Sequence, residues 1–240
     1  MTVLVIRPQE QGQALCRQLA KIQVPAICHP IMTVTAGTEL DSITTKLNHA
    51  DIIISVSQHV ASYTQNQLTN SNQPWPKATY LAVGRKSAQA LEAVSNQKVQ
   101  YPETSDSEHL LTVSALQNVT DKRIIILRGN GGRETLFDEL SARGANVEYI
   151  EVYRREMQPF NASACCGLWQ NHCVDTLIVT SGNQLAYFLS QIDPMHMQWV
   201  LGLRLLVPSQ RLVQHAKQMG FSQVTNTGGA SNQAIMNALR

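Results

Sequence analysis

Small polar residues, glycines and arginines follow several of the apolar runs in this chain, each just ahead of a predicted helix. At or just after the ends of these runs lie Arg7 (run 3–6), Ser55 and Ser57 (run 51–55), Gly84 and Ser87 (run 80–83), Arg128, Gly129 and Arg133 (run 123–127), Thr180, Ser181 and Asn183 (run 176–180), and Ser209 (run 203–207). Free N–H groups at a helix start, with arginine nearby, suit carboxylates or phosphates. Plain capping is the commoner use of Ser, Thr and Asn at any single loop, so both roles stay open.

Tyr153 is the candidate for acid chemistry. It lies between Val152 and Arg154-Arg155 in a segment predicted to connect two domains, so we expect its side chain to face the gap between them. A phenol near cations can act as a proton donor. An aromatic side chain that packs on the connecting strands fits the same pattern, and the sequence does not distinguish between the two roles.

Several familiar sites are disfavoured. Residues 129–132 (GNGG) lack the Lys-Ser/Thr pair of a phosphate-binding loop, and Glu134 stands where a dinucleotide-binding turn has its third glycine. Arg7-Pro8-Gln9 follows the first strand, where such cofactors usually bind. Neither Arg7-Pro8 nor Ser55 supplies the acidic pair that would hold magnesium in a phosphoacceptor domain. We therefore predict no nucleotide site and no catalytic metal.

Composition narrows the class further. The 240 residues carry 19 basic and 17 acidic side chains, so no nucleic-acid-binding surface is expected. No apolar stretch reaches membrane-spanning length and the start does not resemble a signal peptide, which favours the cytoplasm. The five cysteines form an odd set and are expected to be reduced. Cys165, Cys166, His172 and Cys173 lack the paired spacing of a structural zinc site.

The stretch 123–155 has the clearest signals for where strands, turns and helices begin and end. An apolar run, a glycine-rich turn, an amphipathic helix, Gly144 and a second strand predict a βαβ unit. Elsewhere the predicted strands are also continuous apolar runs, which is typical of parallel sheets covered by helices on both faces. A helix is expected over 107–116, with Ser107 as its N-cap. The fold class predicted is α/β with two doubly wound parallel sheets.

Two extended segments, 31–37 and 150–157, suggest places where the chain crosses between domains. We predict a discontinuous domain formed by residues 1–30 and 158–240, a second domain formed by 38–149, and a linker in which the two segments pair as an antiparallel ladder. Two consecutive domains divided near residue 120 are the alternative.

The motifs taken together resemble the uroporphyrinogen-III synthase (HemD-like) family over the whole chain. The resemblance rests on Arg7-Pro8, Ala82-Val83-Gly84 with Ser87-Ala88, Pro102, Ser107-Glu108 with Leu110-Leu111, Leu127-Arg128-Gly129 with Arg133, Leu136, Leu140 and Gly144, Val152-Tyr153-Arg154, Thr180-Ser181, and the last helix introduced by Gly220 and Ala230. Ser87, Ser55 and Pro208-Ser209 depart from the residues common in the family.

The resemblance implies two α/β domains joined by a two-stranded ladder, and a cyclase in tetrapyrrole biosynthesis. Such an enzyme takes hydroxymethylbilane, expels its terminal hydroxyl as water and closes the ring with inversion of ring D through a spiro intermediate. It needs no metal or organic cofactor. The polar loops would bind the carboxylates of the substrate, and Tyr153 would assist loss of the hydroxyl. A monomer, with at most transient contact with the upstream deaminase, is implied as well.

Two other functions fit parts of the pattern. A two-lobed protein that closes on a small anionic ligand would share the linker and the helix N-termini, without any dehydration chemistry. A Rossmann-type methyltransferase is weakened by the missing glycine turn after the first strand. Product analysis with hydroxymethylbilane distinguishes all three.

Overall fold

A computed structural model describes residues 1–239 and divides the chain into two compact units. Unit 1 combines residues 1–33 with the chain from Glu156 onward, and unit 2 comprises residues 34–155. The chain passes between them twice, inside strands β3 (Met32–Ala36) and β8 (Asn146–Met157). Among the described residues, no helix is both long and apolar enough to cross a membrane.

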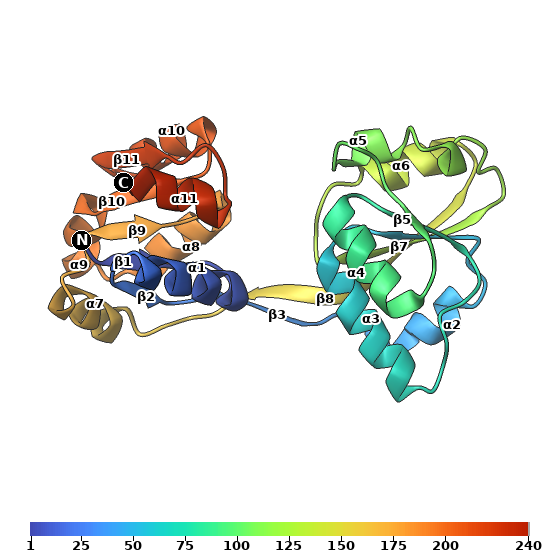
Figure 1. Ribbon diagram of the computed structural model, residues 1–240, viewed down its shortest axis with the longest axis horizontal. Coiled ribbons are helices and arrows are strands. Elements are labelled where there is room, and N and C mark those ends of the chain that lie inside the picture. The colour runs from blue at the N-terminus through green and yellow to red at the C-terminus, as the bar shows by residue number, and fades with distance from the viewer. Residues whose placement is uncertain (240) are drawn as a thin grey trace. The chain divides into compact units, whose positions relative to one another are not determined.

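Unit 1 is built on a parallel sheet of five strands. Its elements are β1 (Val3–Val5), α1 (Gln9–Lys21), β2 (Ala26–Cys28), α7 (Ala162–Asn171), β9 (Thr176–Ile178), α8 (Gly182–Gln191), α9 (Pro194–Gly202), β10 (Arg204–Val207), α10 (Gln210–Gln218), β11 (Gln223–Asn226) and α11 (Asn232–Leu239) (Figure 1). The strand order is β11-β10-β9-β1-β2, and every pair is parallel. Strands from both ends of the chain therefore share one sheet.

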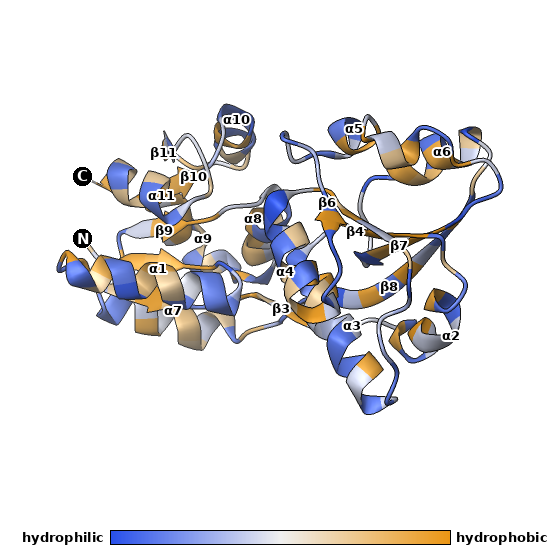
Figure 2. Cartoon of the chain, turned by 45° about the vertical axis from the view of Figure 1, so that its right-hand side comes forward, coloured by the Kyte–Doolittle hydropathy of each residue, from blue (hydrophilic) through white to orange (hydrophobic). Residues whose placement is uncertain are grey.

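Alternation along β1 explains why helices cover both faces of this sheet. Val3 and Val5 pack on one face with side chains from α1 and α11, whereas Leu4 and Ile6 pack on the other face with α7, α8, α9 and α10. Successive side chains of a strand point to opposite faces, so an uninterrupted apolar run needs two apolar layers. Figure 2 shows the strands as largely hydrophobic and the helices with mixed faces.

Unit 2 contains a sheet of six strands in the order β3-β8-β7-β4-β5-β6. Its further elements are η1 (Leu40–Ser42), α2 (Ile43–Leu47), β4 (Ile52–Ser55), α3 (Gln58–Asn70), β5 (Thr79–Ala82), α4 (Arg85–Ser95), β6 (Val99–Gln100), α5 (Ser107–Leu110), η2 (Ser114–Leu116), β7 (Arg123–Gly129) and α6 (Thr135–Ala142) (Figure 1). Strands β4 to β8 pair in parallel. Strand β3 runs antiparallel to β8. The Gly37 N–H donates to the Val152 carbonyl and the Gln158 N–H donates to the Ile31 carbonyl, so residue numbers rise along one strand as they fall along the other.

The sheet of unit 2 is also covered on both faces. Ile53, Ile125 and Ile150 face α2, α3 and α4, and Ile52, Ile54 and Ile124 face the layer of α5 and α6. The predicted fold class, α/β with two mainly parallel sheets, is thus confirmed.

A β-bulge changes the pairing of β7 with β8. Arg128 pairs with Glu151, but the next residue, Gly129, pairs with Tyr153, so Val152 has no partner on β7. An extra residue in one strand turns the following side chain toward a new direction. Val152 and Tyr153 consequently lie in the same apolar cluster, although they are neighbours in the strand.

Two local predictions were wrong. The helix expected over 107–116 is broken into α5 and η2, and its N-cap is Asp106, whose carboxylate accepts from the His109 N–H at 2.7 Å, rather than Ser107. Helix α9 was not predicted at all. Its apolar residues lie on several sides of the helix, so the sequence shows no apolar stripe at helical spacing there. The proline at its start is a residue that also occurs in loops.

Candidate functional site

Each sheet has one point where the strand order reverses direction. In unit 1 it lies between β1 and β9, because the chain adds β2 on one side of β1 and then β9, β10 and β11 on the other. In unit 2 it lies between β4 and β7. In open parallel sheets, ligands bind outside the carboxyl ends of the strands at such a switch point, where adjacent loops diverge. Most of the predicted residues lie in the loops after these strands or after their parallel neighbours.

Arg7 lies two residues after the end of β1, at the switch point of unit 1. Its side chain is 6% exposed and donates to three neutral oxygens: Nη1 to Asn232 Oδ1 at 2.7 Å, and Nη2 to Gln11 Oε1 at 3.2 Å and to the Ala230 carbonyl at 3.1 Å. The Nε atom is buried without a hydrogen bond among the described residues. Burial lowers the pKa of Arg7 from its ordinary value. A cation in this setting retains its attraction for an anion.

Thr180, Ser181 and Asn183 follow β9 on the other side of this switch point. Ser181 is the N-cap of α8, but its side chain makes no capping hydrogen bond, and Asn183 lies in the first turn. Helix α1, which starts after Pro8, likewise has no side-chain cap. Within the described residues, two helices therefore start here with N–H groups that no capping side chain satisfies, as an anion site requires.

Ser209 follows β10 and has a different role. Its hydroxyl accepts a hydrogen bond from the Leu212 N–H at 3.4 Å, so it caps α10. Of the two roles considered for a serine before a helix, capping and anion binding, Ser209 has the capping role.

In unit 2, the serines after β4 are used inside the loop itself. Ser55 is fully buried and its hydroxyl donates to the Ser57 carbonyl at 3.1 Å, while the Ser57 hydroxyl accepts from the His59 N–H at 3.3 Å and caps α3. These bonds hold the loop in the shape that starts α3.

Gly84 and Ser87 follow β5. Gly84 is the N-cap of α4 and supplies no capping side chain, and Ser87 lies in the first turn of this helix. The Ser105 hydroxyl lies directly over the α-carbon of Gly84, at 2.5 Å from where a Cβ would be. A hydroxyl from a distant loop thus reaches the start of α4. Sequence reasoning missed Ser105, because no local pattern links residue 105 to residue 84.

Arg128 and Arg133 both pair with carboxylates. Arg128 is 8% exposed, donates to Glu134 at 3.0 Å and lies 4.2 Å from the centre of the Tyr149 ring. The hydrogen bond from Arg128 lowers the pKa of Glu134. Arg133 is exposed and forms an ion pair with Glu108, which lowers the pKa of that carboxyl.

Tyr153 is the most enclosed of the predicted residues that carry a ring or a charge. The residue is 1% exposed, and its ring packs over Gly129, in the space that a Cβ at that position would fill. The ring centres of His59 and Tyr63, both on α3, lie 5.4 and 6.5 Å from that of Tyr153. The hydroxyl accepts a hydrogen bond from Arg155 Nη2 at 3.0 Å. Contrary to the prediction that this side chain faces a gap between domains, the phenol is packed inside unit 2, and the exposed Arg155 contacts its hydroxyl.

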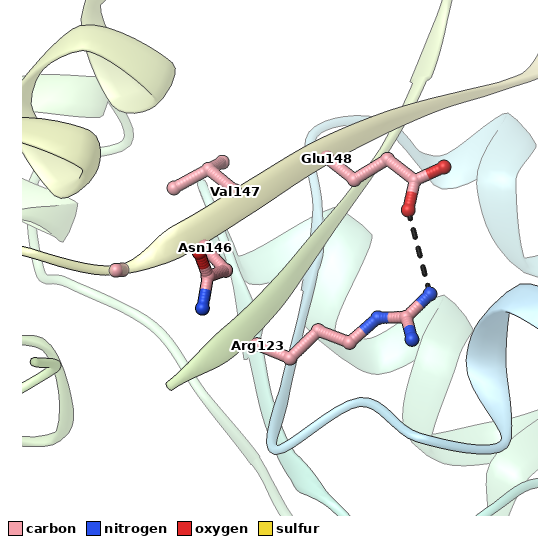
Figure 3. A pocket seen from close by; sticks show the side chains of 5 residues that line it. Arg123, Asn146, Val147 and Glu148 are labelled. Atoms are coloured by element: carbon pink, nitrogen blue, oxygen red, sulfur yellow. Dashed lines mark hydrogen bonds and ion pairs between the residues drawn. The ribbon is translucent and has the colours of Figure 1, made fainter. Parts of the chain in front are cut away.

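A surface depression of about 580 Å³ lies away from these residues (Figure 3). It is lined by Arg123, Ala145, Asn146, Val147 and Glu148, at the amino ends of β7 and β8. Arg123 and Glu148 form an ion pair of 3.5 Å across it. Since the predicted residues of unit 2 lie at or beyond the carboxyl ends of its strands, this depression is not part of the candidate site.

Metal-binding side chains do not gather anywhere in residues 1–239: no group of three or more His, Cys, Asp or Glu side chains could hold an ion. Cys165, Cys166, His172 and Cys173 accordingly form no such cluster.

A family model covers most of the chain. Residues 13–233 match the model described as "Uroporphyrinogen-III synthase HemD". The matched range includes every predicted site residue except Arg7.

Curated relatives are similar over the full length. The uroporphyrinogen-III synthases of Escherichia coli (strain K12) and Salmonella typhimurium are each 36% identical over 246 aligned positions, which cover 100% of both chains. That of Proteus mirabilis is 32% identical over 79% of this chain and 98% of its own.

Solved structures share the fold. A uroporphyrinogen III synthase from the extremely thermophilic bacterium Thermus thermophilus superposes with a TM-score of 0.62 at 15% identity, covering 99% of this chain and 96% of that one. The enzyme from Helicobacter pylori 26695 also gives 0.62 at 15% identity, over 100% and 99%. From the family model and the full-length relatives together, the chain belongs to the uroporphyrinogen-III synthase HemD family, as its motifs predicted.

Proposed function

We propose that this chain cyclises hydroxymethylbilane, with loss of water and inversion of ring D through a spiro intermediate. Its family comprises the uroporphyrinogen-III synthases, hydro-lyases of tetrapyrrole biosynthesis. The observation that carries the proposal is 36% identity to the Escherichia coli synthase along the whole of both chains. Similarity of this extent spans the loops at the carboxyl ends of both sheets as well as the cores.

An anionic substrate suits the switch point of unit 1. The bilane carries acetate and propionate groups, and a carboxylate there would meet Arg7, which has no acidic partner among the described residues, and the uncapped starts of α1 and α8. Charged hydrogen bonds of this kind are roughly twice as strong as neutral ones. We propose Arg7, Thr180, Ser181 and Asn183 as carboxylate-binding residues of unit 1.

In unit 2 we propose binding through the start of α4, where Gly84 leaves N–H groups without a side-chain cap and Ser87 adds a hydroxyl. The other predicted residues of this unit, Ser55, Ser57, Arg128, Gly129 and Arg133, would act by shaping the loops, because their contacts are made within the unit. Ser209 would do the same in unit 1.

The chemical step needs a proton for the departing hydroxyl, and we propose that Tyr153 donates it. The C–O bond breaks as the proton is transferred, and water leaves. Holding a flexible bilane in a ring-closing conformation would supply much of the remaining acceleration, since well-oriented reactions inside one molecule gain up to roughly 7–11 kcal/mol. No step calls for a metal or an organic cofactor.

Incubation with freshly made hydroxymethylbilane tests this function. The enzyme is expected to yield the type III product, whereas the type I product forms spontaneously without it. Type I product alone, despite tight binding of the bilane, would favour the two-lobed binding protein instead.

The Tyr153→Phe variant tests the proposed acid. We expect kcat to fall by roughly 10²-fold or more, as is usual for loss of a general acid, with little change in the melting temperature. An unchanged kcat would remove Tyr153 from the mechanism and leave conformational control of the bilane as the account of catalysis.

The domain boundaries 1–30 with 158–240 and 38–149, the hinge formed by 31–37 and 150–157, the monomeric state and the transient contact with the upstream deaminase stay predictions. Sedimentation velocity with and without the deaminase tests the last two.

A further inference from the structure

The Gly-Asn-Gly-Gly turn after β7, unsuited to a nucleotide, holds the end of β8 in place. The Asn130 side chain makes two hydrogen bonds to the backbone of Arg155: Oδ1 accepts from the Arg155 N–H at 2.7 Å, and Nδ2 donates to its carbonyl at 3.1 Å. The Asn130 N–H also donates to the Tyr153 carbonyl at 3.2 Å. One asparagine therefore sets the backbone on both sides of Arg154.

Arg155 in turn contacts the hydroxyl of Tyr153. Its Nη2 donates to the Tyr153 Oη at 3.0 Å, and its guanidinium carbon lies 5.2 Å from the ring centre. Arg155 is exposed, whereas Tyr153 as a whole residue is 1% exposed. His59 and Tyr63 face the same ring from α3. Arg155 thus places a permanent positive charge against this phenol.

The direction of this hydrogen bond matters for proton transfer. A guanidinium has donors and no acceptor, so Tyr153 can only accept from Arg155, and the phenolic proton remains available to another acceptor. A buried phenolate would be costly in isolation. A cation that already donates to its oxygen stabilises that charge without rearrangement.

We infer that Arg155, held by Asn130, is a positioning residue that stabilises the Tyr153 phenolate when the proton has been given up. The inference rests on the proposed dehydration step. In that step the proton moves from Tyr153 Oη to the leaving hydroxyl, the C–O electron pair departs with the water, and the phenolate remains bonded to Arg155. The proton released from a pyrrole carbon after the new C–C bond has formed returns to the phenolate, so the enzyme is regenerated.

A double-mutant cycle tests this coupling. Arg155→Gln is expected to lower kcat roughly 10–100-fold in the otherwise unchanged enzyme, with KM changed less than about threefold. In the Tyr153→Phe background the same substitution should change kcat less than about twofold, because the group it serves is gone. Arg155→Lys should recover part of the lost rate.

Arg154→Gln is the matched control. It removes a neighbouring arginine that pairs with Glu151 at 3.1 Å, and kcat should stay within about twofold of the unchanged enzyme. Asn130→Ala should lower kcat in the unchanged enzyme and not in the Tyr153→Phe background. Circular dichroism and thermal melting verify that each variant is folded.

The outcomes separate the inference from the function it rests on. Equal losses from Arg155→Gln in both backgrounds, or a loss in KM alone, would overturn the inference and leave the cyclase intact. A Tyr153→Phe variant with full activity would overturn it too, while type III product still upheld the cyclase. Failure of the unchanged enzyme to make type III product would overturn the proposed function itself.

Discussion

Arg7 in unit 1 and Arg128 in unit 2 both stand at the end of a buried strand beside the switch point of their sheet, yet they are paired differently. Arg7 donates to Asn232, Gln11 and Ala230, which are all neutral acceptors. Arg128 donates to the Glu134 carboxylate and lies against the Tyr149 ring. The two have almost the same burial, 6% and 8% exposed, so the difference lies in their partners.

The comparison indicates that position after a strand does not decide what an arginine does. A carboxylate within hydrogen-bond distance offsets the charge of Arg128, which makes this side chain a structural part of its loop. Neutral oxygens satisfy donors of Arg7 without offsetting its charge, so the pKa of Arg7 is lowered by burial. Only the arrangement around Arg7 leaves a cation for an anionic ligand.

The largest expected effect comes from removing the cation of unit 1. Arg7→Met should raise KM for hydroxymethylbilane roughly 10–100-fold, which corresponds to about 1.5–3 kcal/mol for one charged hydrogen bond. Steady-state kinetics measure the change. Arg7→Lys should lose less, because it keeps the charge. Should KM stay constant in folded Arg7→Met, the contrast between the two arginines would lose its functional meaning.

Next in size is the packing of Tyr153 over Gly129. Gly129→Ala places a methyl group in the space of the ring and should destabilise the protein by about 1–3 kcal/mol, with reduced kcat. Chemical denaturation measures the loss. In a Tyr153→Ala background the methyl has room and the added loss should largely vanish. Gly167→Ala in α7, where nothing described lies within 4 Å of the new methyl, is the control that should not destabilise.

A smaller effect is expected for the neutralised arginine of unit 2. Arg128→Met should lower the free energy of unfolding by about 1–2 kcal/mol through the lost contacts with Glu134 and Tyr149, while KM of the folded enzyme stays unchanged. Arg133→Met, which removes an exposed ion pair, is expected to have a smaller effect on stability than Arg128→Met. A large rise in KM for Arg128→Met would erase the distinction from Arg7.

The smallest effect concerns a half-buried imidazole of unit 1, His29. His29 packs edge-on against Phe160 and Trp169, its Nε2 is buried without a hydrogen bond among the described residues, and burial lowers its pKa. In the unfolded chain the imidazole has its ordinary pKa of about 6.5, so the unfolded state binds the proton first on acidification. The stability from neutral His29 is present above that value and is lost as pH falls through the lower, folded pKa.

The expected slope is at most about 1.4 kcal/mol per pH unit for one proton. Denaturation curves between about pH 5 and 8 measure it, and His29→Gln should flatten the profile. Phe160→Leu, which removes one ring packed against the imidazole but keeps the imidazole itself, should lower stability at every pH and leave a slope between those of the unchanged protein and His29→Gln. An unchanged slope in His29→Gln would show that other groups govern it.

Local patterns predicted most of the strands and helices correctly. Strands buried on both faces leave continuous apolar runs, and Ser57 and Ser209 are the N-caps that their position suggested. The broken helix after Asp106 could not be found this way, because its second turn is replaced by a bend that packs Leu110 and Leu116 on the sheet.

The candidate site was predictable as a set of positions and not as a set of roles. Asn130 was visible as part of a turn, but its bonds to Arg155 join residues 25 positions apart. Ser105 reaches Gly84 from another loop. Such contacts depend on which strands become neighbours in the sheet, and residue spacing along the chain does not predict that order.

The sequence by itself determined the α/β class, the family and the polar residues that end the strands, because periodicity and short motifs are local properties. The tertiary structure decided which of these residues keep their chemistry. It gave Arg128 a carboxylate partner, left Arg7 with neutral ones, and packed Tyr153 over Gly129 with Arg155 on its hydroxyl. The reason is physical: charge compensation and burial are set by neighbours in space, and Asn232 reaches Arg7 across 225 residues of chain.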